Sequence, residues 1–202
     1  MPRPRVHAPD AVLDAAEELL VERGRAQVTI RVLAERSGAS NGSIYHSFGS
    51  LETVVGAAWL RRAHQFLAMQ RAAVDEALAA GEGRRAVQDA ADAPARLADD
   101  DLRAAQLLVA LQRDDVLTDA VAAPVAEELR ALDTTLAATL RRLARALWDR
   151  GDAAAVDAVT VCVVRLPAAL LFGEIRTGRV RQHTRAQLAA AVGAVLDCGP
   201  PH

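Results

Sequence analysis

The sequence predicts an all-α protein, with an N-terminal three-helix helix-turn-helix domain followed by a C-terminal helical bundle. Apolar residues recur along most of the chain at the three- and four-residue steps of a helix. Ala, Leu and Val supply most of the apolar mass, and aromatic residues make up only 3% of the 202 residues, which favours packed helices over a sheet. Gly and Pro cluster at a few points, where they end one helix or begin the next. These signals together predict about nine helices.

Three short helices are predicted within the first 50 residues. Each starts at a residue suited to the first turn of a helix and ends at a glycine. The predicted starts are Pro9-Asp10, Thr29 and Ser40, and the predicted ends are Gly24, Gly38 and Gly49. Ser50 is expected to cap a fourth, much longer helix.

The remaining chain predicts six helices, near residues 51–80, 84–97, 101–113, 124–148, 153–176 and 184–196. The helix at 124–148 carries leucines at steps of three and four, which form one continuous apolar stripe. The β-branched stretch 159–164 would suit a buried strand, but a lone strand has no partner here, so we predict helix. We expect two domains, at residues 1–50 and 51–202.

Charge, cysteines and hydropathy exclude some classes of protein. The formal net charge is -2, and residues 1–67 hold eight Arg against seven acidic residues, so charge alone does not indicate nucleic-acid binding. Cys162 and Cys198 form no C-x-x-C pair, and no His/Cys cluster has zinc spacing, so we expect inert thiols in the cytoplasm and neither metal nor cofactor. The apolar stretch 153–172 contains Asp157 and Arg165, which argues against a membrane span.

The segment from Thr29 to Leu51 carries the functional information. Ala34 is small enough for a close helix crossing, and Gly38, four residues later, suits the tight turn between two helices. Ile44, six residues further on, is the apolar anchor of the second helix. The remaining positions of that second helix are small or polar and nearly uncharged, which suits close approach to a DNA groove.

This segment resembles the tetracycline-repressor (TetR) family of transcriptional regulators. The resemblance covers about Val6 to Leu67, and its core is Thr29-Ile30-Arg31-x-Leu33-Ala34-x-x-Ser37-Gly38-Ala39-Ser40-x-Gly42-Ser43-Ile44-Tyr45-His46-x-Phe48. It implies a homodimeric, sequence-specific DNA-binding regulator, most often a repressor that a small-molecule ligand releases from its double-stranded operator.

The resemblance also implies roles for single residues. Asn41 and Gly42 fall where the family reaches base edges, and Arg31 and the Arg3/Arg5 arm are expected phosphate contacts. Phosphate or sugar contacts are implied for Thr29, Ser40, Ser43, Tyr45 and His46.

Two positions depart from the family pattern. Leu51 occupies a position that is usually Lys, and Asn41 one that is often basic. Each departure removes a positive charge, so DNA affinity is expected to depend less on salt than is usual in the family.

Two further surfaces are expected in the C-terminal domain. The candidates for a ligand pocket are Trp59, His64, Phe66, Met69, Gln106, Gln112 and Trp148, for which packing in the core is the alternative. The helix at 153–176 is apolar on more faces than one core covers, so we expect it to form a dimer interface with the last helix. The predicted interface residues are Val156, Val159, Val163, Leu170, Leu188, Val192 and Val195, unless the chain itself covers both sides of the helix.

Two other functions remain open at the level of sequence. A small helical enzyme is one, although the chain shows no Ser/His/Asp or Cys/His arrangement and no recognisable carboxylate pair. The other is an interaction protein that keeps the fold and has weakened DNA binding, for which Leu51 is the main argument. Turnover of a substrate would indicate the enzyme, and a gel shift with promoter DNA would separate the regulator from the interaction protein.

Overall fold

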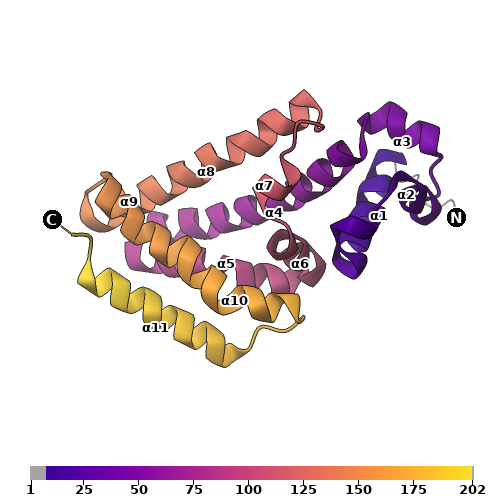
Figure 1. Cartoon of the computed structure of the whole chain (residues 1–202). Helices are drawn as coiled ribbons and strands as arrows, with labels where there is room; N and C mark the ends of the chain where they lie inside the picture. Colours follow the sequence, from indigo (N-terminus) through magenta and orange to yellow (C-terminus); the bar gives the residue numbers. More distant parts are fainter. Residues whose placement is uncertain (1–7, 202) are drawn as a thin grey trace, which may run out of the picture. The chain divides into compact units, whose positions relative to one another are not determined.

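A computed structural model describes residues 8–201, and within them every regular element is a helix (Figure 1). The all-α prediction is confirmed. The elements are α1 (Ala8–Arg23), the 3₁₀ turn η1 (Arg25–Gln27), α2 (Ile30–Ser37), α3 (Asn41–Phe48), α4 (Leu51–Ala79), α5 (Gly83–Asp100), α6 (Leu102–Ala110), α7 (Arg113–Val116), α8 (Ala123–Trp148), α9 (Ala153–Thr160), the π-helical turn η2 (Val161–Arg165), α10 (Leu166–Arg176) and α11 (Gln182–Cys198).

All nine predicted helices are present, with ends shifted by at most three residues. The helix expected at 101–113 ends earlier, at Ala110, and the one-turn helix α7 follows it. This turn was not predicted. Asp115 stabilises its start, because its Oδ2 accepts a hydrogen bond of 2.8 Å from the backbone N–H of Gln112.

The predicted caps of α2, α3 and α4 are formed. Thr29 Oγ1 accepts a hydrogen bond from the N–H of Val32, and Ser40 Oγ accepts one from Ser43. Ser50 Oγ does the same for Thr53, at the start of α4. These bonds satisfy backbone N–H groups that have no partner inside the helix, so each helix begins directly after its cap residue.

The described residues divide into two compact units that alternate along the chain. The first contains the described residues up to Ala63 together with Gln106–Ala131, and the second contains His64–Ala105 and the residues from Leu132 onward. The helices α4 and α8 each continue from one unit into the other. The core of the first unit includes Leu19, Leu33, Ile44, Val54 and Leu129, and that of the second includes Leu97, Leu143, Leu171, Ile175 and Leu188.

Polar contacts attach residues 106–131 to the start of α4 inside the first unit. Thr53 Oγ1 accepts a hydrogen bond of 2.9 Å from the N–H of Ala122, and Ser50 Oγ donates to the carbonyl of Ala120 at 2.8 Å. Gly56 lets this segment come close, because an added Cβ would lie 3.4 Å from a methyl group of Val125. The segment 106–131 therefore packs against the first turns of α4 and is hydrogen-bonded to them.

The helices α9 and α10 are continuous through η2, so the β-branched stretch is helical, as predicted. The N–H of Leu166 bonds to the carbonyl of Val161, five residues earlier, instead of the usual four. Pro167 follows directly, and a proline has no N–H to donate and clashes with the carbonyl four residues before it. A single wide turn next to a proline lets the helix continue without a break.

A second proline, Pro94, lies inside α5 and has a different compensation. In an α-helix the carbonyl of Ala90 would accept from the N–H of residue 94, which proline lacks. The side-chain amide of Gln70, on α4, donates to that carbonyl at 2.9 Å, and Gln70 is only 2% exposed. The buried carbonyl is thereby satisfied by a neighbouring helix.

Candidate nucleic-acid interface

Helices α2 and α3 form a helix-turn-helix. The turn between them starts at Gly38, whose φ of 74° lies in the left-handed region that glycine adopts without strain. Leu33 of α2 and Ile44 of α3 are buried, and both helices pack against α1. The three helices are the indigo and violet segments of Figure 1. The predicted anchor Ile44 therefore lies in the core of this unit, whereas Ala34, the residue predicted at the helix crossing, is half-buried.

The surface of α3 contains most of the predicted DNA contacts. Asn41, Gly42, Tyr45 and His46 are exposed, and Ser43 is half-buried. Tyr45 is 54% exposed, which is unusual for a large aromatic side chain. Thr29, Arg31 and Ser40 are also exposed, so the eight predicted residues are all within reach of solvent.

Ion pairs neutralise several arginines of this unit. These ion pairs were not predicted from the sequence. Arg31 Nε bonds to Glu35 Oε1 at 3.0 Å, one helical turn further along α2, although both side chains are more than half exposed. Arg36 bonds to Glu18 and Glu22 of α1. The i, i+4 spacing of Arg31 and Glu35 is the signal that could have shown the first pair. The expected Arg3/Arg5 arm lies outside the described residues.

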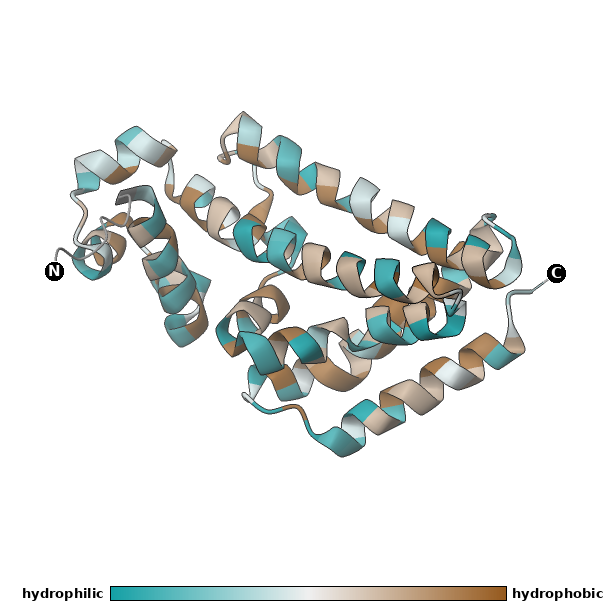
Figure 2. Ribbon diagram, turned by 180° about the vertical axis from the view of Figure 1, so that it is seen from behind, coloured by the Kyte–Doolittle hydropathy of each residue, from teal (hydrophilic) through white to brown (hydrophobic). Residues whose placement is uncertain are grey.

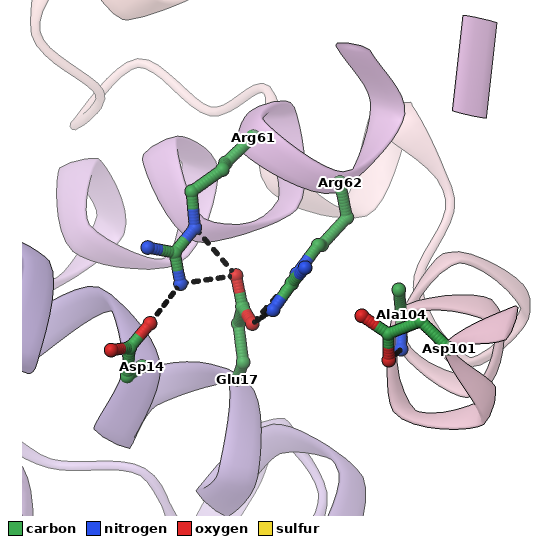
Figure 3. A network of polar contacts seen from close by, with 6 residues as sticks. All are labelled: Asp14, Glu17, Arg61, Arg62, Asp101 and Ala104. Atoms are coloured by element: carbon green, nitrogen blue, oxygen red, sulfur yellow. Dashed lines mark hydrogen bonds and ion pairs between the residues drawn. The ribbon is translucent and has the colours of Figure 1, made fainter. Parts of the chain in front are cut away.

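A buried carboxylate connects α1 to α4 (Figure 3). Glu17 is 2% exposed, and Arg61 Nε and Nη2 donate to its Oε1 at 2.9 and 2.7 Å. Arg62 Nε donates to the other oxygen at 2.7 Å, and Arg61 also reaches Asp14 at 2.6 Å. A buried charge needs such partners, because removing it from water is costly. This cluster ties α1, on which α2 and α3 pack, to α4.

The proposed ligand residues are distributed over the two units. Trp59 is 9% exposed, and its indole N–H donates to the carbonyl of Leu111 at 3.0 Å, within the first unit. His64 and Gln112 are exposed. Phe66, Met69, Gln106 and Trp148 are half-buried.

A hollow of about 250 Å³ lies elsewhere, between α5 and α11. Leu188 and Val192 line it, together with the ion pair of Arg185 and Asp92, whose Nε and Oδ1 are 2.9 Å apart. None of the seven proposed ligand residues lines this hollow.

The only cysteine inside the core, Cys162, has a thiol pKa raised to about 11 by burial, so it is unreactive at neutral pH.

Four of the seven residues proposed for the dimer interface are core residues of one chain, which corrects their assignment. Val159 and Val192 are fully buried, and Leu188 and Val163 are 2% and 5% exposed. They contact neighbouring helices of the same unit, so they do not form a surface. Val156, Leu170 and Val195 are half-buried.

The outward face of the same helices is largely apolar, although Asp157 and Arg165 are also exposed on it. Val164 is 37% exposed and is one of two large apolar residues at the described surface. The helix Ala153–Arg176 is long and apolar enough to cross a membrane by length and composition, and 33% of its apolar window is buried inside the chain. Figure 2 shows α11, the helix that ends near the label C, mostly in tan and brown after a teal first turn.

The fold and this surface define the class of the protein: an all-helical chain with an N-terminal helix-turn-helix that presents an uncharged second helix to solvent. Residues 12–58 match the model of the tetR family of bacterial regulatory proteins. The helix-turn-helix of this chain is therefore similar to that family, as its motif predicted. Among the described residues, no group of three or more His, Cys, Asp or Glu side chains could hold a metal ion.

Known proteins resemble this chain over different lengths. The chain is 40% identical over 57 residues to the HTH-type transcriptional repressor Rv3405c of Mycobacterium tuberculosis, a match that covers 28% of this chain and 30% of that protein. A tetR-family regulatory protein from Rhodococcus matches with a TM-score of 0.65 and 18% identity, over 97% of this chain and 99% of the other. PfmR, a tetR-family regulator from Thermus thermophilus, matches with a TM-score of 0.63 and 19% identity, over 92% and 97%. The whole chain therefore has the fold of these regulators.

Proposed function

We propose that the protein is a cytoplasmic, sequence-specific DNA-binding transcriptional regulator that acts as a homodimer. The exposed surface of α3 is the observation that carries this proposal. A solvent-facing helix of a globular protein normally carries charged residues, whereas α3 presents small, hydrogen-bonding side chains and the exposed ring of Tyr45. Such a helix fits the major groove of DNA, which its side chains can approach closely.

In this proposal residues 1–50 bind DNA and residues 51–202 serve dimerisation and sensing. The apolar outward face of α9, η2 and α10 supports dimerisation, because a second copy related by a two-fold axis would cover it. The ion pair between Asp157 and Arg165 lies on the surface of this helix, at 2.8 Å, and charged groups of this kind are costly inside a bilayer. We therefore assign the face to a partner chain and not to a membrane.

Release from DNA by a small molecule completes the proposed function. The ligand would bind among the helices that follow the helix-turn-helix, and the seven candidate residues and the hollow between α5 and α11 are the places to test. The relative named as a repressor supports repression as the direction of regulation.

The substitution Tyr45→Ala tests the proposed function. We expect it to weaken binding to promoter DNA and to random duplex by similar factors, because a contact to phosphate or sugar carries no sequence information. Gel shifts with DNA upstream of the protein's own and neighbouring genes measure the affinity for promoter DNA. Gel shifts with a shuffled duplex measure the affinity for random DNA. Thr134→Ala, an exposed position on α8, is the control and should bind as the unmodified chain does. A folded Tyr45→Ala protein with unchanged affinity would refute the assignment.

A further inference from the structure

The side chains of α3 limit which bases the helix can read. The helix contains no Arg, Lys, Asp or Glu between Asn41 and Phe48. Guanine is read most often by the two parallel hydrogen bonds of an Arg or Lys, and cytosine by a carboxylate. Adenine is read by the amide of Asn or Gln, which donates to N7 and accepts from the N6 amino group. The chemistry of α3 is therefore suited to adenine and lacks the usual readers of guanine and cytosine.

Asn41 is the single amide side chain on the two helices of the helix-turn-helix. It is exposed, and within the described chain its side chain makes no hydrogen bond. Its neighbours Ser40 and Ser43, by contrast, are hydrogen-bonded to each other. Ser40 Oγ accepts a hydrogen bond from the N–H of Ser43 at 3.1 Å, which caps the first turn of α3. Asn41 thus stands on a rigid turn with its donor and acceptor both available.

Gly42, the next residue, has no explanation inside the protein. It lies in the helix and is not among the glycines with a positive φ. A Cβ added to it would meet only Ser40 Oγ, at 3.9 Å. Alanine would therefore fit and would favour the helix. A glycine in such a place is expected where another molecule approaches the backbone closely.

We propose that Asn41 selects an A·T pair in each half-site of the operator through a bidentate contact with adenine, and that Gly42 provides the space for this contact. The inference rests on the proposed DNA-binding function and names the base that its recognition helix prefers. It also explains the uncharged surface of α3, since adenine recognition by an amide needs no charged side chain.

Selection from a pool of random DNA duplexes by the full-length chain tests the inference. The selected sites should contain one invariant A·T pair in each half-site. Replacing this pair by G·C should weaken binding of the unmodified chain about 5- to 150-fold. The same replacement should change the affinity of Asn41→Ala very little, because that variant has lost the amide, and the other selected positions should keep their preference.

Gly42→Ala separates DNA contact from folding. Its melting temperature should rise, because alanine is the better helix former, whereas its affinity for the selected site should fall. Thr134→Ala on α8 also replaces a weaker helix former by alanine, so it should raise the melting temperature and leave DNA affinity unchanged. An unchanged affinity of Gly42→Ala would overturn the role of this glycine.

The failure of the inference and that of the proposed function give different results. If the unmodified chain enriches no sequence and shifts no duplex, the proposed DNA-binding function is wrong. If it enriches a clear site, but Asn41→Ala keeps the preference at every position or the site holds no invariant A·T pair, only the assignment of Asn41 is wrong.

Discussion

At the scale of single residues, Glu35 would compete with DNA for Arg31 in the proposed complex. The pair lies on the exposed side of α2, where an ion pair contributes about 0.2 to 1 kcal/mol to stability. Phosphate would have to replace Glu35 as the partner of Arg31, and Glu35 itself would repel the backbone of DNA. In the proposed complex this pair would therefore oppose binding.

We predict that Glu35→Gln tightens binding to all duplexes and makes affinity more dependent on salt. Each phosphate contact that a basic residue gains steepens the plot of log affinity against log salt concentration by about one unit. Titrations at several salt concentrations measure this slope. Glu82→Gln is the matched control, since Glu82 is also exposed and bonded to an arginine, Arg85. An unchanged slope for Glu35→Gln would show that Arg31 does not contact phosphate.

The candidate site was predictable at this scale because its signals are local. Cap residues and Gly38 act within one turn of the chain, and the exposure of Asn41 and Tyr45 follows once Ile44 points inward. The partners of Glu17 were not predictable, because Arg61 and Arg62 lie more than 40 residues away and nothing in the sequence pairs them.

At the scale of secondary-structure elements, the two prolines inside helices show two ways to compensate for a missing N–H. Pro167 is accommodated by its own helix, which widens into the π-helical turn η2. Pro94 depends on another helix, since Gln70 of α4 donates to the carbonyl of Ala90. The crossing of α4 and α5 is thereby specified by a polar contact as well as by packing.

We predict that Gln70→Leu lowers the free energy of unfolding by about 1 to 3 kcal/mol, the usual cost of leaving a buried polar group without a partner. In a Pro94→Ala background the cost should be clearly smaller, because the N–H of Ala at position 94 can then bond to the carbonyl of Ala90. Urea unfolding of the four proteins gives the coupling between the two sites. Equal costs in both backgrounds would mean that Gln70 contributes in another way.

At the scale of the whole molecule, the two units share the long helices α4 and α8. Residues 106–131 join the N-terminal unit, although they follow it by more than 40 positions. Ser50 and Trp59 donate hydrogen bonds to carbonyl groups of this segment, and Thr53 accepts one from its backbone. A change in the segment 106–131 would therefore act directly on the helix that follows the helix-turn-helix.

Val164→Glu should convert the proposed dimer into monomers and reduce operator affinity strongly. A stable dimer interface often buries about 2,000 Å² or more, and burying an additional charge in such an interface is costly. Because Val164 is 37% exposed, the variant should fold, unlike one with Glu at the buried Val163 or Val192. Sedimentation velocity measures the assembly, and Ala138→Glu, at an exposed position of α8, is the control. An intact dimer in the Val164→Glu variant would place the interface elsewhere.

The helices, the caps of α2, α3 and α4 and the helix-turn-helix could be predicted from the sequence, because they depend on residues within a few positions of each other. Which side of the helix at 153–176 faces the core depends on its packing in the folded chain. A helix that is apolar all round has no pattern that distinguishes an inner from an outer face, so Val159 and Val163 could equally have been surface residues. The same holds for the joining of residues 106–131 to the first unit and for the pairing of Gln70 with Ala90. Each depends on contacts between segments that lie far apart in the chain, and such contacts form only when the helices pack.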